Sequence, residues 1–322
     1  MRAIRFDNVG GPEVMRLVDV DLPPPGAGEL RLKQAAIAIN FIDTYHRSGL
    51  YPMKLPSGLG LEAVGVVEAV GAGVTDFAAG DRAGYCTGPV GAYAEAHNVP
   101  AGRAVKIPDA ISDDIAASVL MKGMTSEYLL RRTYPVKEGE TILFHAAAGG
   151  VGQVACQWAR ALGATVIGTV GSDAKVELAK SNGCDHVIVS SREDIAARVM
   201  EITGGKGVAV SYDGVGKESW DASLASLSLR GVQVSFGNAS GPVPPVSPAV
   251  LSPKSLYLTR PGLFSYTSTT EELRMSAAVL FDVMLSGNVK IAPPTVYTLA
   301  DAAKAHADLE GRRTTGSLIL KP

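Results

Sequence analysis

A run of small residues between positions 147 and 152 could hold a phosphate group. Ala147-Ala148-Gly149-Gly150-Val151-Gly152 fits the pattern G-x-G-x-x-G, except that alanine stands at the first position. In that pattern the second glycine lets the backbone approach a pyrophosphate, and the third lets a helix pack closely on a strand. Backbone N–H groups at a helix start attract the anion. We therefore expect a dinucleotide to bind at Ala148, Gly149, Gly150, Val151 and Gly152.

The residues after the next predicted strand indicate which dinucleotide is bound. Sites that select NAD place an Asp or Glu there, about 20 residues further on, to bind the ribose 2′-hydroxyl. This chain has Val170-Gly171-Ser172 at that place and Lys175 one turn later. A hydroxyl and an ammonium group can bind a 2′-phosphate, so we predict NADPH, with Ser172 and Lys175 at its 2′-phosphate. The alternative is that Lys175 is a solvated helix residue.

The phosphate-binding loop needs a strand before it and a helix and strand after it. Residues 141–144 and 165–170 are β-prone, and residues 154–162 carry apolar side chains at helical spacing. Further strands are indicated at 186–189, 208–212, 231–236 and 255–259, with helices at 173–182, 192–203 and 219–227. This alternation predicts a doubly wound parallel sheet, a Rossmann domain over residues 124–265. Ligands bind at the carboxyl ends of such strands, which adds Val215, Phe236, Gly237 and Asn238 as candidates.

The residues on either side of this domain follow a different sequence pattern. Residues 1–6, 14–20, 29–39, 62–70 and 81–85 are strand-like runs separated by glycine and proline clusters, which favours a barrel-like or sandwich domain. We expect a helix over 115–130, capped by Ser112 and broken near Gly123. After a proline-rich loop at 241–248 we expect a helix over 270–286, a short helix and a final strand at 316–320. The first domain should therefore comprise residues 1–123 and 266–322.

Composition excludes several classes of protein. With 322 residues, 46% hydrophobic, 19% charged and a net charge of −2, the chain has the composition of a globular protein with two domains. Its Lys and Arg residues form no cluster larger than a pair, so we expect no nucleic-acid partner. The absence of a long apolar run and of a signal-peptide core predicts a cytoplasmic protein outside membranes. The three cysteines and five histidines show no metal-ligand spacing.

Longer motifs are similar to those of a known family. They are Asn40-Phe41-Ile42-Asp43-Thr44-Tyr45, Arg47-Ser48-Gly49-Leu50-Tyr51, Leu55-Pro56-Ser57-Gly58-Leu59-Gly60 and the segment Phe144 to Gly152. On these the chain resembles the zinc-independent quinone oxidoreductases, relatives of zeta-crystallin in the medium-chain dehydrogenase/reductase superfamily. The resemblance covers the whole chain, and alanine at position 147 is normal in this subgroup. It implies a GroES-like catalytic domain beside the Rossmann domain, and a homodimer paired through an edge strand from Ser255 to Leu263.

Zinc-dependent members of the superfamily differ at two positions. They have a cysteine where this chain has Asn40, and a histidine before the glutamate, where this chain has Leu61-Glu62. Neither Asn40 nor Leu61 supplies the thiolate or imidazole that a catalytic zinc requires. We therefore expect no metal and no alcohol dehydrogenase activity.

The resemblance also implies roles at the cofactor site. Thr125 would face the nicotinamide; the alternative is a helix hydroxyl bonded to the previous turn. Arg312 would join the 2′-phosphate site, with Arg313 in its place or both as surface charges as the alternatives. Ser190 stands near the place where relatives use an aromatic residue over the adenine.

The candidates for substrate contact and catalysis are Asn40, Asp43, Tyr45, Tyr51 and Arg260. Tyrosine offers a flat face to a planar acceptor and a phenol to its carbonyl oxygen. Donors from Asn40, Tyr45 or Arg260 would stabilise the negative charge that a quinone oxygen gains with a hydride. The alternative for the two tyrosines is packing at the rim of the first domain.

Taken with the resemblance, these residues predict an NADPH:quinone oxidoreductase that transfers hydride without zinc in an interdomain cleft. Reduction of activated C=C bonds in enones or 2-alkenals is the enzymatic alternative. A non-enzymatic, NADPH-regulated role in RNA binding or as a crystallin is the third hypothesis.

Overall fold

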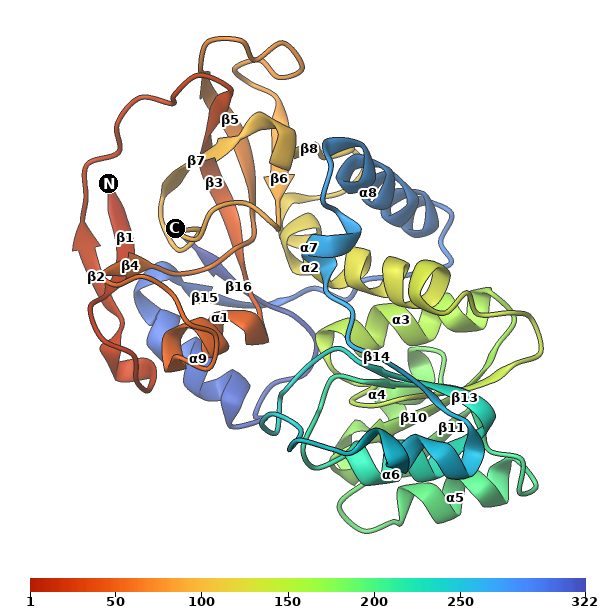
Figure 1. Ribbon diagram of the computed structural model, residues 1–322. Helices are drawn as coiled ribbons and strands as arrows, with labels where there is room; N and C mark the ends of the chain where they lie inside the picture. Colours follow the sequence, from red (N-terminus) through yellow and green to blue (C-terminus); the bar gives the residue numbers. More distant parts are fainter. The chain divides into compact units, whose positions relative to one another are not determined.

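The computed structural model describes residues 1–322, and the chain forms two compact units (Figure 1). Unit 1 comprises residues 1–121, 267–281 and 291–322, and unit 2 comprises residues 122–266 and 282–290. No helix in either unit has the length and apolar character needed to cross a membrane.

Unit 1 is built on two β-sheets. The smaller has the order β2-β1-β4, with β2 at Arg16–Asp19, β1 at Arg2–Phe6 and β4 at Ser57–Gly58. The larger has the order β15-β16-β3-β5-β6-β8, and β7 also pairs with β3. Its strands are β15 (Thr295–Thr298), β16 (Leu318–Lys321), β3 (Glu29–Ile39), β5 (Ala63–Val70), β6 (Arg82–Tyr85), β8 (Val105–Lys106) and β7 (Ala96–Pro100).

The long strand β3 organises this unit. Its first half pairs with β7, and its last three residues pair with β16, so the end of the chain lies in the same sheet as the N-terminal segment. The alternation of buried and exposed residues in its first half places Leu30 and Leu32 in the core, as expected for a strand with one buried face. Strand β3 ends at Ile39 and thereby delivers Asn40 to the start of helix α1.

Helix α1 (Phe41–Ser48) was not expected from the sequence. Asn40 is its N-cap and forms a capping box with Asp43, and Gly49 ends the helix at a φ of 82°. Capping of this kind stabilises a short helix, and glycine adopts the left-handed conformation without a Cβ penalty. The other helices of unit 1 include α8 (Thr270–Leu285), which runs into unit 2, and α9 (Ala302–Glu310).

Unit 2 is the predicted Rossmann fold. Its parallel sheet has the order β11-β10-β9-β12-β13-β14. The strands are β9 (Thr141–Phe144), β10 (Thr165–Val170), β11 (His186–Val189), β12 (Val208–Asp213), β13 (Leu227–Ser235) and β14 (Tyr257–Thr259). Helix α3 (Gly150–Ala161) covers one face, as Figure 1 shows, and α5 (Ile195–Ile202) and α6 (Trp220–Ser226) cover the other.

Some local expectations were wrong. Helix α2 (Asp113–Tyr128) continues through Gly123 and ends in a π-helical turn, Leu129–Thr133. A glycine inside a helix costs only about 1 kcal/mol, which the buried surroundings of Gly123 offset. Residues 173–182 form a 3₁₀ turn, Asp173–Lys175, followed by the short helix α4 (Val176–Ser181). Strands β4, β7, β8 and β15 were missed, because strands of two to five residues give little periodicity to read.

Candidate active site

The loop between β9 and α3 is a tight turn around Ala146. This residue has a φ of 55°, and its carbonyl oxygen accepts the N–H of Gly149 at 2.8 Å. Gly149 is the N-cap of α3, and a Cβ on Gly152 would lie 2.5 Å from the oxygen of Ala146. Only glycine fits at position 152, because the first turn of α3 packs directly on the loop. The N–H groups of that turn lie at the carboxyl edge of the sheet, where anions bind.

The alanine at position 147 is accommodated by the neighbouring strand. Ala147 is fully buried. A Cβ on Gly168 of β10 would lie 2.8 Å from the Cβ of Ala147 and 2.4 Å from the sulfur of Cys184. The missing side chain at Gly168 therefore makes room for the methyl group of Ala147.

The end of β10 carries a carboxylate that the sequence argument overlooked. Ser172 and the half-buried Lys175 flank Asp173. Arg192 donates to Asp173 Oδ1 from Nη2 at 2.8 Å and from Nε at 3.1 Å, and this hydrogen-bonded guanidinium lowers the pKa of Asp173. Arg192 balances the negative charge and adds a cation beside the place predicted for the 2′-phosphate. Ser190 donates its hydroxyl to the oxygen of Val170 at 3.1 Å.

The ends of β12 and β13 meet through two glycines. A Cβ on Gly237 would lie 2.3 Å from the oxygen of Gly214, so the two loops are in direct backbone contact. Arg260, which follows β14, donates from Nη1 to the Gly237 oxygen at 3.1 Å and to Ser235 Oγ at 3.2 Å. The structure thus brings together three predicted segments at this edge, namely Val215, Phe236–Asn238 and Arg260.

A buried polar cluster beneath these loops was missed by the sequence argument. The carboxylate of Asp213 accepts hydrogen bonds from the N–H of Val215 at 2.8 Å and of Gly216 at 3.0 Å. Both of its oxygens accept from Ser219 Oγ at 2.7 Å, and Oδ2 accepts from Ser223 Oγ at 2.9 Å. These four donor groups, with the single hydroxyl proton of Ser219 shared between the two carboxylate oxygens, compensate the buried charge. The one sequence signal was the position of Asp213 at the end of a predicted strand.

Asn40 and Asp43 are buried in unit 1. Asn40 Nδ2 donates to Glu62 Oε2 at 2.7 Å, and Glu62 Oε1 accepts the N–H of Met121 at 2.6 Å. Asp43 Oδ2 accepts the N–H of Asn40 at 2.8 Å and the hydroxyl of Tyr93 at 3.0 Å. Asp43 has no exposed surface, so its expected contact with a substrate is not supported. It fixes the start of α1 and thereby the backbone of Asn40.

The two candidate tyrosines lie against each other. The ring centroids of Tyr45 and Tyr51 are 5.2 Å apart at an interplanar angle of 62°, which is the edge-to-face arrangement that aromatic pairs favour. His46 lies 6.2 Å from Tyr51 between ring centroids, and burial lowers the pKa of His46. Both tyrosines are half-buried, so part of each ring remains accessible.

The residues around Asn40 do not fit a zinc ion. No group of three or more His, Cys, Asp or Glu side chains in the structure could hold a metal. Leu61 is an apolar core residue, and the carboxylate of Glu62 is held by two N–H donors. A catalytic zinc needs three protein ligands with nitrogen, sulfur or carboxylate donors.

The remaining predicted residues lie on different elements. Thr125 is a nearly buried residue of α2 in unit 2. Arg312 and Arg313 are exposed residues of unit 1 after α9. Arg313 donates from Nε to Asp308 Oδ1 at 2.8 Å and from Nη2 to the oxygen of Ala307 at 2.9 Å. The backbone of Arg312 is left-handed, with a φ of 56°.

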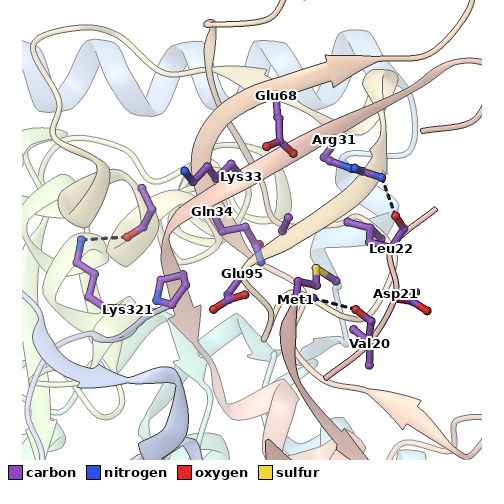
Figure 2. Close-up of a pocket in the computed structure, with 13 residues that line it drawn as sticks. Met1, Val20, Asp21, Leu22, Arg31, Lys33, Gln34, Glu68, Glu95 and Lys321 are labelled. Atoms are coloured by element: carbon purple, nitrogen blue, oxygen red, sulfur yellow. Dashed lines mark hydrogen bonds between the residues drawn. The ribbon is translucent and has the colours of Figure 1, made fainter. Parts of the chain in front are cut away.

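Unit 1 also has an open cavity of about 590 Å³, shown in Figure 2. Its lining mixes apolar residues with charged ones, which include Arg31, Lys33, Glu68 and Lys321. Arg31 donates to the oxygen of Leu22 (Figure 2), and Lys321 donates to that of Ala35. None of the predicted site residues lines it, so we assign it no part in the chemistry.

Comparison with known proteins gives a consistent result. Residues 26–109 match the family "Alcohol dehydrogenase GroES-like domain", and residues 150–279 match "Zinc-binding dehydrogenase". A quinone oxidoreductase of Pseudomonas aeruginosa is 52% identical, over 100% of this chain and 99% of that protein. A 2-haloacrylate reductase of a Burkholderia species is 44% identical, over 97% and 96%.

A solved structure extends the likeness to three dimensions. The structure of Escherichia coli quinone oxidoreductase complexed with NADPH superposes with a TM-score of 0.98 at 49% identity, and the match covers 100% of both chains. The two units described above are therefore a GroES-like domain and a Rossmann domain. The chain belongs to the quinone oxidoreductases of the medium-chain dehydrogenase/reductase superfamily.

Proposed function

We propose that this protein is an NADPH-dependent quinone oxidoreductase that works without zinc. The observation that carries the proposal is the carboxyl edge of the Rossmann sheet, where a glycine-rich turn precedes α3 and the β10 end carries Ser172, Lys175 and an Asp173 neutralised by Arg192. The quinone oxidoreductase relatives, one of them solved with NADPH, support it.

The cofactor would bind along that edge. The N–H groups of Ala148, Gly149, Gly150, Val151 and Gly152 hold the pyrophosphate, and Ser172 and Lys175 hold the 2′-phosphate with Arg312. Arg313, which binds Asp308 and the end of α9, is the alternative to Arg312. Ser190 lies beside the adenine ribose. Val215, Phe236, Gly237, Asn238 and Thr125 belong to the nicotinamide end.

The protein's own residues then position a quinone and stabilise its reduced form. NADPH, when bound, supplies the hydride. Tyr45 and Tyr51 offer aromatic surface for a planar acceptor. Asn40, whose amide is oriented by Glu62, and Arg260 are the donors for the quinone oxygen, where negative charge develops. Solvent delivers the one proton that completes the hydroquinone, and no residue acts as a metal ligand.

Reduction of an activated C=C bond is the second candidate, because a 2-haloacrylate reductase is among the relatives. The test is turnover of 1,4-benzoquinone and 9,10-phenanthrenequinone against 2-alkenals and 2-haloacrylate, with NADPH and with NADH. We expect quinone turnover with NADPH, unchanged by a zinc chelator. Brisk alkenal or haloacrylate turnover without quinone turnover would favour the second candidate, and loss of activity with the chelator would refute zinc independence.

We also propose that the protein forms a homodimer through the segment from Ser255 to Leu263. Strand β14 is the edge of the sheet, and Tyr257 and Leu258 there are 62% and 42% exposed. An exposed apolar edge strand is a template for pairing with another chain. Light scattering should give twice the mass of the chain, and Leu258→Lys should shift it toward the monomer. A monomeric wild type would contradict this proposal.

A further inference from the structure

A continuous chain of hydrogen bonds runs beneath the phosphate-binding loop. The N–H of Ala146 donates to Thr169 Oγ1 at 3.2 Å, and Thr169 Oγ1 lies 3.3 Å from His145 Nδ1. His145 Nε2 lies 2.9 Å from Ser223 Oγ, which donates to Asp213 Oδ2 at 2.9 Å. The members come from β10, the β9–α3 loop, α6 and β12. The four side chains that take part, those of Thr169, His145, Ser223 and Asp213, are buried.

Only one arrangement of protons satisfies every member. An ionised carboxylate can only accept, so Ser223 gives its single proton to Asp213 and accepts one from His145 Nε2–H. His145 Nδ1 then accepts the hydroxyl proton of Thr169, whose oxygen accepts the N–H of Ala146. Burial lowers the pKa of His145, in agreement with a neutral imidazole that both donates and accepts. Every group in this hydrogen-bond chain therefore donates in the same direction, from the N–H of Ala146 toward the carboxylate of Asp213.

Each end of this chain fixes one loop at the carboxyl edge of the sheet. At one end Ala146 is held at a φ of 55°, a left-handed conformation that is unfavourable for a residue other than glycine. That conformation allows the Ala146 oxygen to accept the N–H of Gly149 and to sit against Gly152. At the other end Asp213 holds the N–H groups of Val215 and Gly216.

We propose that Thr169, His145, Ser223 and Asp213 are positioning residues that preset the phosphate-binding loop and the Val215 loop for the two halves of the dinucleotide. They do not touch the cofactor, because their side chains are buried, and they act through the backbone of Ala146 and of Val215. This inference rests on the proposed function for its ligand, NADPH. If these residues only stabilised the fold, their substitution would lower the free energy of unfolding but would not selectively weaken binding of the pyrophosphate part of NADPH.

The test compares isosteric and conservative variants in the full-length protein. Thr169→Val removes the hydroxyl and keeps the shape, whereas Thr169→Ser keeps the hydroxyl. Ser223→Ala breaks the hydrogen-bond chain on the far side of His145. Its matched control is Ser226→Ala, because Ser226 is equally buried in α6 and donates only to the Ala222 oxygen of its own helix, at 2.7 Å.

The first measurement is the Kd of NADPH beside that of adenosine 2′-monophosphate, which carries a 2′-phosphate but no pyrophosphate. We expect Thr169→Val and Ser223→Ala to weaken NADPH binding about tenfold, the effect of losing one hydrogen bond and part of the loop geometry. Binding of the monophosphate should stay within about twofold, as should NADPH binding by Thr169→Ser and Ser226→Ala. Equal weakening of both ligands, or no weakening of either, would overturn the proposal.

The second measurement uses no cofactor. Amide hydrogen exchange of residues 146–150 should accelerate in Thr169→Val and Ser223→Ala, while residues of β9 and α5 exchange as in the wild type. Unchanged exchange of the loop would refute the positioning role. If the wild type binds no NADPH, the proposed function fails, and the exchange data still decide whether this chain holds the loop.

Discussion

Replacing His306 with glutamine should make the protein less sensitive to mild acid. His306 is fully buried on α9. Its Nδ1 lies 3.0 Å from Arg47 Nη1, which can only donate, and its Nε2 lies 2.9 Å from the hydroxyl of Tyr93. The Tyr93 hydroxyl donates to Asp43, and Arg47 also pairs with Glu310. Burial first, and the charge of Arg47 second, lower the pKa of His306 from 6.5 to about 3.

The sign of the effect follows from proton counting. Between pH 6.5 and about pH 3, the unfolded chain binds a proton at position 306 and the folded chain does not, so acid favours unfolding in this window. Between pH 7 and pH 5 this single group removes about 2 kcal/mol of unfolding free energy. His306 stays neutral in the folded protein at pH 5, because pH 5 lies well above its folded-state pKa. The loss of unfolding free energy between pH 7 and pH 5 therefore depends only on the pKa in the unfolded chain. Glutamine cannot bind this proton, and its amide can still donate and accept.

The assay is urea unfolding of the wild type and of His306→Gln at pH 7 and pH 5. The variant should be less stable than the wild type at pH 7, and this difference should shrink by about 2 kcal/mol at pH 5. The control is His186→Gln, which removes an exposed histidine and makes the same chemical change outside the cluster around His306. An equal loss for His306→Gln at both pH values would refute the reasoning.

Three further predictions concern the Rossmann domain. Lys175→Ala should raise the KM for NADPH about ten- to a hundredfold, the effect of losing a charge-assisted hydrogen bond, with little change for NADH; equal effects in steady-state kinetics would remove Lys175 from the 2′-phosphate site. Gly152→Ala should destabilise the protein by about 1–3 kcal/mol, because its Cβ would lie 2.5 Å from the Ala146 oxygen, and an unchanged Tm would contradict that close packing. Asp173→Asn should increase the preference for NADPH over NADH, because it removes an anion and leaves Arg192 able to bind a phosphate; a lower ratio of kcat/KM values would argue against this placement.

The sequence was sufficient wherever the information is local. The alternation of apolar β-prone runs with helical spacing predicted the strands and helices of the Rossmann domain, because strands buried on both faces of a parallel sheet are apolar throughout even when they are short. The segment Ala147 to Gly152 predicted the turn before α3. Small residues are needed there because larger side chains would clash with backbone only a few positions away in the sequence. Asn40 and Leu61 argued against zinc by their chemistry alone. The roles of the cofactor and substrate residues stay predictions.

Only the tertiary structure decided which residues meet. Asp43 was expected at the substrate, but folding buries it against Asn40 and Tyr93. Asp173 is neutralised by Arg192, which lies 19 residues away in the chain. Ala147 fits because Gly168 on the next strand leaves space for it. The hydrogen-bonded chain from Ala146 to Asp213 joins residues of four elements, and no local pattern contains it, because hydrogen-bond partners are selected by where the strands and helices pack.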